Sequence, residues 1–458
     1  MEFSYDKLIK TKHDTIIKGL TVTVPGKTLV QRSDITIVKG TKNALIGING
    51  IGKTTVMNAL EIICDDAYLL SQFSEDLDSE ISVIDAVIKS DKETTIVRSK
   101  LEQLNEKEEL TDEDLEQLDL LENQLRFKNG KHIAYKILHG LGFEDRINAS
   151  CKTLSGGWLQ RLSLAKALFV EPTMLLLDEP CNHLDLEGIQ WLSDYLCDYT
   201  KALIVVSHDI GFLEPFATHY LCMNDKNITK FNTLEKALEY LCIDDQVDDI
   251  QFPESKYMTH SMAAIRINDV SFKYCTVDPY ILKNIDIYID RSTKIIITGS
   301  NGSGKSTLLK MMMGSLSPTS GEIHVDQKLR LLYLDQHMIS KIDTNISSIE
   351  FLKHNTSNND HTTIHKSLSV CGLTKETRLK PLSSLSGGEK TRVLMALICI
   401  HDAHVILLDE PTNHLDIAST ISVTNAIKHF PGGVVVVTHN QYVINQLLSE
   451  GNVEHLVL

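Results

Sequence analysis

Short runs of apolar residues recur along the chain between longer amphipathic stretches. The runs have the length of buried parallel strands and lie at 43–48, 174–177, 202–206, 294–299, 405–408 and 434–437. Helix-like runs at 56–63 and 308–313 follow two of them, and we expect Met311–Met313 to fill a core. Strands that alternate with helices predict an α/β fold with a mainly parallel sheet.

One set of motifs surrounds these runs and occurs twice in the same order. The first copy reads GINGIGKTT (47–55), LSGGW (154–158), LLLDEP (175–180), NHLD (182–185) and SHD (207–209). The second copy reads GSNGSGKST (299–307), LSGGE (385–389), ILLDEP (406–411), NHLD (413–416) and THN (438–440). Ser155 and Ser386 are 231 residues apart, as are Asp178 and Asp409. The repeat predicts a first nucleotide-binding domain over 1–224, a short acidic linker over 225–262 and a second domain over 263–458.

Each copy contains the pattern G-x-x-x-x-G-K-[ST], in which backbone N–H groups converge on phosphate oxygens at a helix N-terminus. The lysine neutralises the β- and γ-phosphates, and the following hydroxyl can ligate Mg²⁺. Two matches, each followed by a strand that ends in Asp-Glu, predict binding of ATP or GTP. The candidate phosphate-binding residues are Gly47, Asn49, Gly50, Gly52, Lys53, Thr54 and Thr55 in the first copy, and Gly299, Asn301, Gly302, Gly304, Lys305, Ser306 and Thr307 in the second.

The acidic strand ends carry the predicted hydrolytic chemistry. In each copy the aspartate can hold Mg²⁺, the next glutamate can activate the attacking water, and a histidine after the neighbouring strand can contact the γ-phosphate. An acidic pair or a single histidine at a strand end is often structural, but the register of these motifs favours catalysis. The candidate catalytic residues are Glu179, His208, Glu410 and His439. The candidate Mg²⁺ ligands are Thr54, Gln72, Asp178, Ser306, Gln336 and Asp409. We therefore expect an ATPase that forms ADP and phosphate.

The LSGG segments suggest why the set is duplicated. Each Ser-Gly-Gly precedes an amphipathic helix, whose N-terminus can receive a γ-phosphate. A nucleotide would lie between the P-loop of one copy and the LSGG segment of the other. Site one would combine Lys53, Gln72, Asp178, Glu179 and His208 with Ser386, Gly387 and Gly388, and site two Lys305, Gln336, Asp409, Glu410 and His439 with Ser155, Gly156 and Gly157. ATP would close such a clamp and hydrolysis would release it.

Tyr274, in SFKY, is a candidate to stack on the adenine of site two; the alternative is a core aromatic at a strand end. The corresponding segment of the first copy, 20–26, has no aromatic residue.

The two copies differ between the P-loop and the LSGG segment. Gln72 and Gln336 are the candidate Q-loop glutamines. From the P-loop lysine to this glutamine the first copy has 19 residues and the second has 31, so we expect the β-subdomain of the first copy to be trimmed. The first copy then gains a leucine-spaced stretch that we interpret as a helical hairpin at about 92–128. Between 102 and 122 it has ten acidic residues and one lysine. It is either a solvated helical face or a docking surface for a basic partner.

The composition of the chain limits the classes of function that this protein can have. Charged residues make up 23% and hydrophobic residues 42% of 458, as in globular proteins, and no apolar run is long enough to cross a bilayer. The first residues, 1–14, are too charged for a secretory signal. Nine cysteines without a CxxC pair indicate a reducing compartment, so we expect a cytoplasmic protein without membrane contact. The net charge of −16 argues against direct, sequence-specific nucleic-acid binding.

Tandem cassettes with D-E-P-x-N-H-L-D in both copies resemble the ABC-F family. The LSGG segment is the signature of each cassette, and the SGGW of the first signature is similar to the family's branch of general-control translation regulators. The segments 336–352 and 429–439 are also similar to that branch. The resemblance implies two ABC-type P-loop domains, each with a parallel core sheet, a β-subdomain and a helical subdomain. It also implies an ATP-closed clamp that acts on ribosomes or translation complexes, with the ribosome or a ribosome-associated protein as partner. The chain would be a monomer whose two cassettes dimerise within it.

Departures from the family pattern keep other functions open. The family usually joins its cassettes by a long basic linker, but here residues 239–254 contain six acidic residues and no lysine or arginine. A nucleotide-switched scaffold outside translation is therefore an alternative, and the ATPase subunit of a membrane transporter is another. Cys181, Glu389 and Asn440 also differ from the usual residues, although none of these changes removes a candidate catalytic group.

Overall fold

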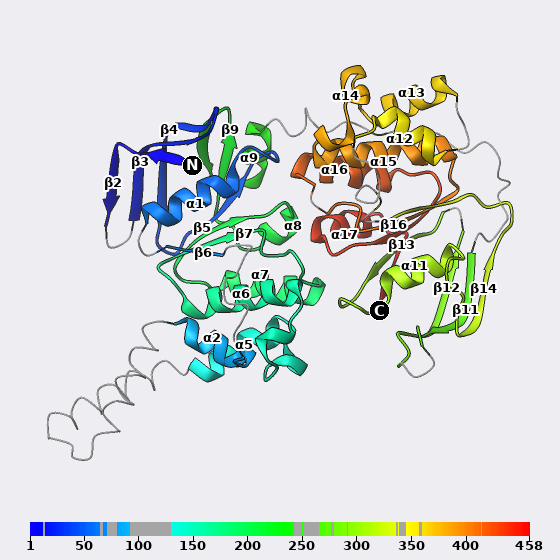
Figure 1. The fold of residues 1–458 in the computed structure, drawn as a ribbon, viewed down its shortest axis with the longest axis horizontal. Helices are drawn as coiled ribbons and strands as arrows, with labels where there is room; N and C mark the ends of the chain where they lie inside the picture. The colour runs from blue at the N-terminus through cyan, green and yellow to red at the C-terminus, as the bar shows by residue number, and fades with distance from the viewer. Residues whose placement is uncertain are drawn as a thin grey trace, which may run out of the picture. The chain divides into compact units, whose positions relative to one another are not determined.

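The computed structural model (Figure 1) divides into two compact units. The first comprises Met1–Ile46, Gly52–Ser207 and Pro215–Leu234, and the second comprises Gly47–Ile51, His208–Glu214 and Glu235–Leu458. The structure describes residues 1–11, 14–64, 67–70, 80–91, 130–241, 250, 252, 265–275, 279–290, 292–335, 338, 345–356, 360–413 and 415–458. The hairpin predicted at about 92–128 lies outside these ranges, and so do Gln72 and Gln336.

The core of the first cassette is a six-stranded sheet in the order β10-β9-β5-β8-β7-β6. Its strands are β5 (Lys42–Ile46), β6 (Ala67–Leu70), β7 (Met174–Asp178), β8 (Ala202–Val206), β9 (His219–Asn224) and β10 (Asn227–Phe231). All neighbours are parallel except β9 and β10, which form an antiparallel hairpin. Residues 227–231, which the sequence assigned to the linker, thus pair with a strand of this sheet.

The second cassette has a five-stranded, wholly parallel sheet in the order β15-β16-β17-β13-β18. Its strands are β13 (Lys294–Thr298), β15 (Leu331–Leu334), β16 (Val405–Asp409), β17 (Gly433–Val437) and β18 (Val453–Val457). All six strands predicted from apolar runs are confirmed. In each cassette the strand before the P-loop, the strand before the histidine and the strand that ends in aspartate are neighbours. Their carboxyl ends therefore meet at one edge, where ligands bind in such sheets.

A separate antiparallel sheet accompanies each core. The first is built from β1 (Glu2–Ser4), β2 (Lys7–Lys10), β3 (Asp14–Val24) and β4 (Lys27–Val38), and the second from β11 (Ile265–Phe272), β12 (Leu282–Ile289) and β14 (Ser320–Val325). β14 follows the P-loop helix, whereas no such strand follows the first P-loop helix among the described residues up to 70. The first antiparallel sheet thus has four strands against three in the second, and the predicted trimming is seen only as the lack of a counterpart to β14 in the described segment after the first P-loop helix.

Helices complete both cassettes, and the amphipathic runs after the motifs are helical as predicted. In the first cassette they are α1 (Lys53–Ile63), α2 (Val83–Ser90), α5 (Gly130–Gly140), α6 (Gly156–Val170) and α7 (Leu186–Cys197). The next two helices along the chain, α8 (Ile210–Leu213) and α9 (Leu234–Tyr240), fall wholly or largely within the second compact unit. In the second cassette they are α11 (Lys305–Met312), α12 (Ser348–Asn355), α13 (His361–Val370), α14 (Lys375–Leu379), α15 (Gly387–His401), α16 (Ile417–Lys428) and α17 (Gln441–Leu448). The helices α2, α5 and α6 pack together, as do α12, α13 and α15.

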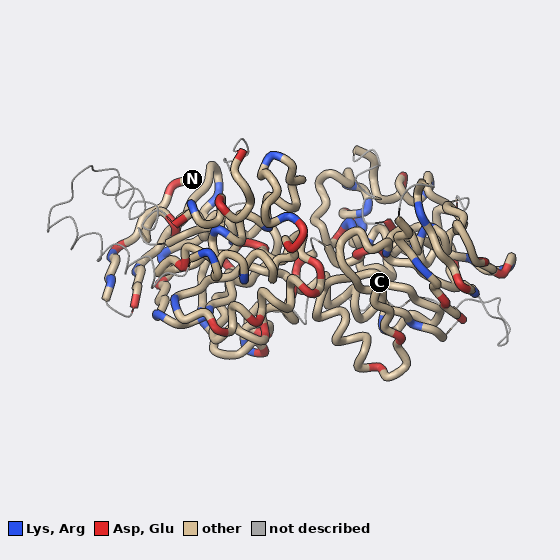
Figure 2. Tube along the Cα trace, turned by 90° about the horizontal axis from the view of Figure 1, so that it is seen from below, with Lys and Arg blue, Asp and Glu red and all other residues tan. Residues whose placement is uncertain are grey.

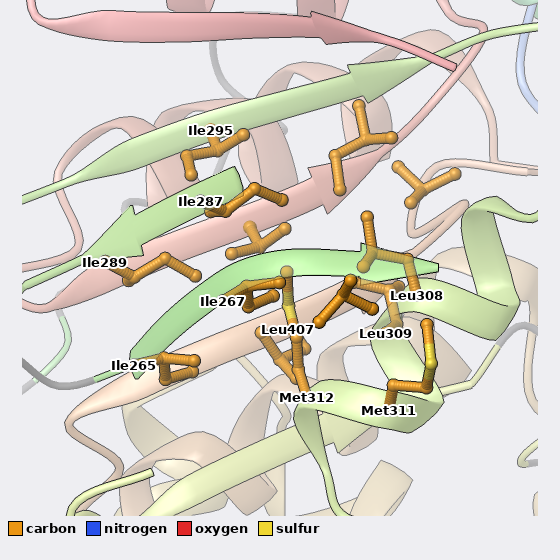
Figure 3. Packing of buried hydrophobic residues seen from close by; sticks show 14 of the residues in the cluster. Ile265, Ile267, Ile287, Ile289, Ile295, Leu308, Leu309, Met311, Met312 and Leu407 are labelled. Atoms are coloured by element: carbon orange, nitrogen blue, oxygen red, sulfur yellow. The ribbon is translucent and has the colours of Figure 1, made fainter. Parts of the chain in front are cut away.

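One apolar cluster joins the antiparallel sheet, the parallel sheet and the P-loop helix of the second cassette (Figure 3). Met311 and Met312 on α11 are buried among Ile265, Ile267 and Leu407, so the core role predicted for these methionines is confirmed. Burial of each such side chain stabilises the fold by about 2 kcal/mol. Because α11 is held on both sides, the P-loop that precedes it has a rigid support.

Charge is mixed over the described chain. Figure 2 shows Lys and Arg interspersed with Asp and Glu along both units rather than gathered into one long basic stretch. Among the described helices, none has the length and apolar character that a bilayer span requires.

Candidate functional site

Each P-loop turns between a parallel strand and a helix through glycines with positive φ. The helix α1 begins at Lys53 after Gly52 with φ 110°, and α11 begins at Lys305 after Gly304 with φ 100°. A Cβ atom on Gly304 would lie 2.7 Å from the Ile281 side chain. Residues other than glycine rarely adopt this backbone conformation, and a side chain at this position would collide with its neighbours. Both loops thus have the turn that exposes N–H groups to phosphate.

The P-loop lysines are held against their own loops. Lys305 Nζ donates hydrogen bonds of 2.8 Å to the carbonyl oxygens of Gly299 and Ser300, and Lys53 is buried to the same degree as Lys305. A phosphate that enters the loop can replace those carbonyls as acceptor. The hydroxyl residues Thr54, Thr55, Ser306 and Thr307 occupy the first turns of α1 and α11, as their predicted role requires.

The Asp-Glu pairs adopt the same backbone geometry in both cassettes. Asp178 ends β7 and Asp409 ends β16, and both are buried. Glu179 and Glu410 follow with φ of 50°, which is uncommon for a residue other than glycine and costs about 1 kcal/mol or more. In each copy the glutamate N–H donates to the last residue of the neighbouring strand, Val206 or Val437, at 2.9 Å. Retention of this strained turn in both copies indicates a shared function.

Glu410 lies beside the predicted histidine of its cassette. His439 Nε2 is 3.6 Å from Glu410 Oε1, and the His439 N–H donates to Glu410 Oε2 at 3.4 Å. Burial raises the pKa of Glu410 to about 8; the nearby Asp409 also raises it, while the His439 N–H and Lys305 act in the opposite direction. A carboxyl group with a pKa near neutrality is suited to accept a proton from water. His208 follows β8 as His439 follows β17.

The two signature helices begin at the expected serines. Ser155 is the N-cap residue of α6 and Ser386 the N-cap residue of α15, so Gly156, Gly157, Gly387 and Gly388 form the first turns. The signatures differ one residue later, where the first has Trp158 and the second Glu389.

Tyr274 lies at the second P-loop helix. Its hydroxyl is 2.9 Å from Thr307 Oγ1, and its ring meets Phe272 edge-on with 5.0 Å between centroids. The residue is 58% exposed, which excludes the alternative of a core aromatic. An exposed ring beside the phosphate-binding helix fits the predicted stacking on adenine.

Two residues at these sites were missed by the sequence interpretation. The Tyr333 hydroxyl donates to Asp409 Oδ2 at 3.1 Å, and burial raises the pKa of this tyrosine. Arg161 on α6 donates to the carbonyl oxygen of His183 at 2.9 and 2.7 Å, and it lies 3.7 Å from Asp185. It therefore ties the signature helix to the NHLD segment. An arginine on the apolar side of α6 was the available sequence signal, whereas nothing local marked Tyr333.

The protein family described as "ABC transporter" matches residues 30–182 and 282–413, which together are more than half of the chain. The chain is 31% identical to ABC transporter F family member 4 of Arabidopsis thaliana, over 95% of this chain and 72% of that protein. It is 31% identical to the ABC transporter ATP-binding protein ARB1 of Saccharomyces cerevisiae, over 96% of this chain and 83% of that protein. The fold is similar to that of a solved structure described as RNase-L Inhibitor, with TM-score 0.64, 21% identity, and coverage of 93% of this chain and 85% of that one.

Paired P-loops, signatures and Asp-Glu strand ends on two parallel sheets define a twin-cassette ABC protein that binds ATP. The chain belongs to the ABC-F family, and it is an ATPase.

Proposed function

We propose that this chain is a translation factor or regulator of the cytoplasm that closes on ribosomes or translation complexes when it binds ATP. The observation that carries the proposal is the strained Asp-Glu turn, which both cassettes of this ABC-F protein retain with φ of 50° at Glu179 and Glu410. Two intact sites favour a clamp that both nucleotides control. One fold neighbour, with TM-score 0.55 and 22% identity over 91% of this chain and 72% of that one, is described as ribosome-bound archaeal Pelota and ABCE1. This neighbour motivates the choice of the ribosome as partner.

In this proposal each nucleotide binds the P-loop of one cassette and is completed by the signature of the other. Site one contains Lys53 and Ser386, and site two contains Lys305 and Ser155. ATP stabilises the closed form because the γ-phosphate of each ATP, which ADP lacks, contacts the signature of the other cassette. One chain supplies both cassettes, so a monomer is sufficient.

Mg²⁺ belongs to the proposed sites as well. Thr54 and Asp178 would hold it in site one and Ser306 and Asp409 in site two, with Gln72 and Gln336 as further ligands. When bound, it neutralises charge on the phosphates. Among the described residues, no group of three or more His, Cys, Asp and Glu side chains is placed to hold a metal ion.

The residues of the second cassette suggest what each side chain does near the γ-phosphate. Glu410 accepts a proton from the attacking water in its ionised form, and its raised pKa of about 8 makes that carboxylate a stronger base than an ordinary glutamate. His439, which lies against Glu410, contacts the γ-phosphate or the water and orients it. Glu179 and His208 take the same roles in site one.

Sedimentation with ribosomes tests the proposal. The Glu179→Gln/Glu410→Gln variant, which should retain ATP, is centrifuged with ribosomes of its own host with ATP, with ADP and without nucleotide. We expect it to sediment with ribosomes only with ATP. If the variant retains ATP and yet stays in the supernatant in all three conditions, the ribosome is not its target.

A nucleotide-switched scaffold outside translation is the second candidate. Its support is the acidic stretch 239–254, which lacks the basic residues that contact with RNA needs. Recovery of a stable partner without ribosomal components, in ATP but not in ADP, would favour it.

A further inference from the structure

The second signature is closed by its own glutamate. Ser386 N–H and Ser386 Oγ donate to Glu389 Oε2 at 2.8 and 3.0 Å, and Ser386 Oγ accepts from the Glu389 N–H at 3.3 Å. This is a complete capping box at the N-terminus of α15. The hydroxyl and one backbone donor of the signature serine thus already contact an anion of the protein.

The first signature has no such anion. Ser155 makes no side-chain capping bond. The third residue of α6 is Trp158, whose indole offers no acceptor to the Ser155 N–H, so the reciprocal bond of a capping box is missing as well. Two guanidinium groups lie over the Trp158 ring, that of Arg161 at 4.7 Å and that of Arg146 at 5.0 Å from its centroid. Phe143 meets the same ring edge-on at 4.9 Å. The two signatures thus differ at the third helix position, where the first has an indole and the second a carboxylate, while each helix keeps an arginine three residues further on, Arg161 and Arg392.

The difference matters for a γ-phosphate. At the second signature the phosphate must break the bonds from Ser386 to Glu389, and it then lies close to a like charge. At the first signature the Ser155 hydroxyl makes no capping bond that a phosphate would have to break, and the third helix position carries no charge that opposes the preference of the helix dipole for an anion.

We propose that Glu389 is an acidic latch on the second signature, so that the nucleotide on the Lys53 P-loop engages its signature more weakly than the nucleotide on the Lys305 P-loop. Glu389 is thus a residue that sets affinity and not a catalytic residue. The inference rests on the proposed function, since it needs each signature to receive the nucleotide of the other cassette.

Binding of ATPγS with Mg²⁺ to single-site variants tests the latch. Lys305→Ala leaves only the Lys53 site, and in that background Glu389→Gln keeps the shape and the capping ability but removes the charge. We expect ATPγS to bind about three- to tenfold more tightly by calorimetry, with a gain that shrinks as salt is raised. The mirror variant, Trp158→Glu in the Lys53→Ala background, should weaken ATPγS binding by a similar factor.

Other outcomes overturn the latch. Unchanged affinity in Glu389→Gln contradicts it, and so does a gain that is independent of salt and accompanied by a shifted unfolding temperature, because that would reflect helix stability. Ser386→Arg in the Lys305→Ala background separates the two proposals. If Ser386→Arg weakens ATPγS binding while Glu389→Gln does not change it, the clamp stands and the latch fails. If Ser386→Arg has no effect, the second signature does not receive this nucleotide, and the proposed function fails with the latch.

Discussion

The catalytic strand ends of the two cassettes are alike, whereas their signature helices begin differently. Glu179 and Glu410 share φ of 50° and the same bond to the neighbouring strand. At the signatures, the first has Trp158, with two guanidinium groups over its ring, and the second has Glu389 in a capping box. The backbone that positions the reacting groups tolerates little change, because a strained turn persists only where its surroundings enforce it. A residue at the third position of a helix can vary, because it tunes the field at the helix N-terminus and leaves the fold intact.

Removal of the two glutamates tests the likeness of the strand ends and should have the largest effect. In Glu179→Gln/Glu410→Gln we expect ATP turnover to fall at least about a hundredfold, because neither site retains a proton acceptor. Each single variant should keep only the turnover of the other site. Phosphate release measures both. The exposed Glu187→Gln serves as control, and normal turnover in the double variant would contradict the assignment.

Loss of the buried guanidinium on α6 should destabilise the first signature. Arg161→Ala leaves the carbonyl of His183 and the carboxylate of Asp185 without their partner, and we expect about 3 kcal/mol lower stability. Arg146→Ala removes the exposed guanidinium from the same indole and should cost well under 1 kcal/mol. Thermal unfolding of both variants makes the comparison, and equal melting temperatures would refute the structural role of Arg161.

The raised pKa of Glu410 predicts a pH dependence of stability. Because its pKa rises from the ordinary 4.5 to about 8 on folding, the contribution of the protonated carboxyl is complete below about pH 4.5 and is lost as pH rises through about 8. Between about pH 6 and pH 8 this group should lower the free energy of unfolding by about 2 kcal/mol. Glu410→Gln should remove that decrease in nucleotide-free protein. Urea unfolding across this range checks it, and parallel pH profiles for both proteins would contradict it.

Variants of Tyr274 test whether an aromatic ring that the first cassette lacks contributes to adenine binding in the second. In the Lys53→Ala background, which leaves the Lys305 site, Tyr274→Ala should weaken ATP binding about fivefold through lost stacking. Tyr274→Phe keeps the ring but loses the contact with Thr307, and it should bind almost normally. Fluorescent-nucleotide titration distinguishes them. Equal weakening in both variants would assign the effect to the hydroxyl.

The smallest effect concerns the tyrosine bonded to the acidic strand end. Tyr333→Phe removes a hydrogen bond to Asp409, so we expect the Mg²⁺ concentration for half-maximal ATP turnover to rise about threefold. Tyr68→Phe is the control from the first cassette, because Tyr68 pairs with Leu175 and is therefore one residue out of register with Tyr333, which pairs with Leu407. An unchanged Mg²⁺ requirement in Tyr333→Phe would show that the bond does not orient Asp409.

Most of the fold could be predicted from the sequence because its signals are local. Runs such as 202–206 and 405–408 are apolar throughout, which suits strands buried on both faces, and the structure has strands at both. The P-loops were recognisable because a left-handed backbone requires glycine at positions such as Gly52 and Gly304. The strand β10 was missed because its residues alternate weakly and it is stabilised by its pairing with β9.

The sequence by itself determined the duplication, the six core strands, the P-loops and the residue types at both candidate sites, because each depends on residues close together along the chain. Only the tertiary structure decided how side chains distant in sequence meet. It brought Tyr333 to Asp409, placed Arg146 and Arg161 on Trp158, and raised the pKa of Glu410 by burial. Burial and charge at a point in space are sums over neighbours that the order of residues does not reveal, and these sums make two cassettes with nearly the same motifs electrostatically different.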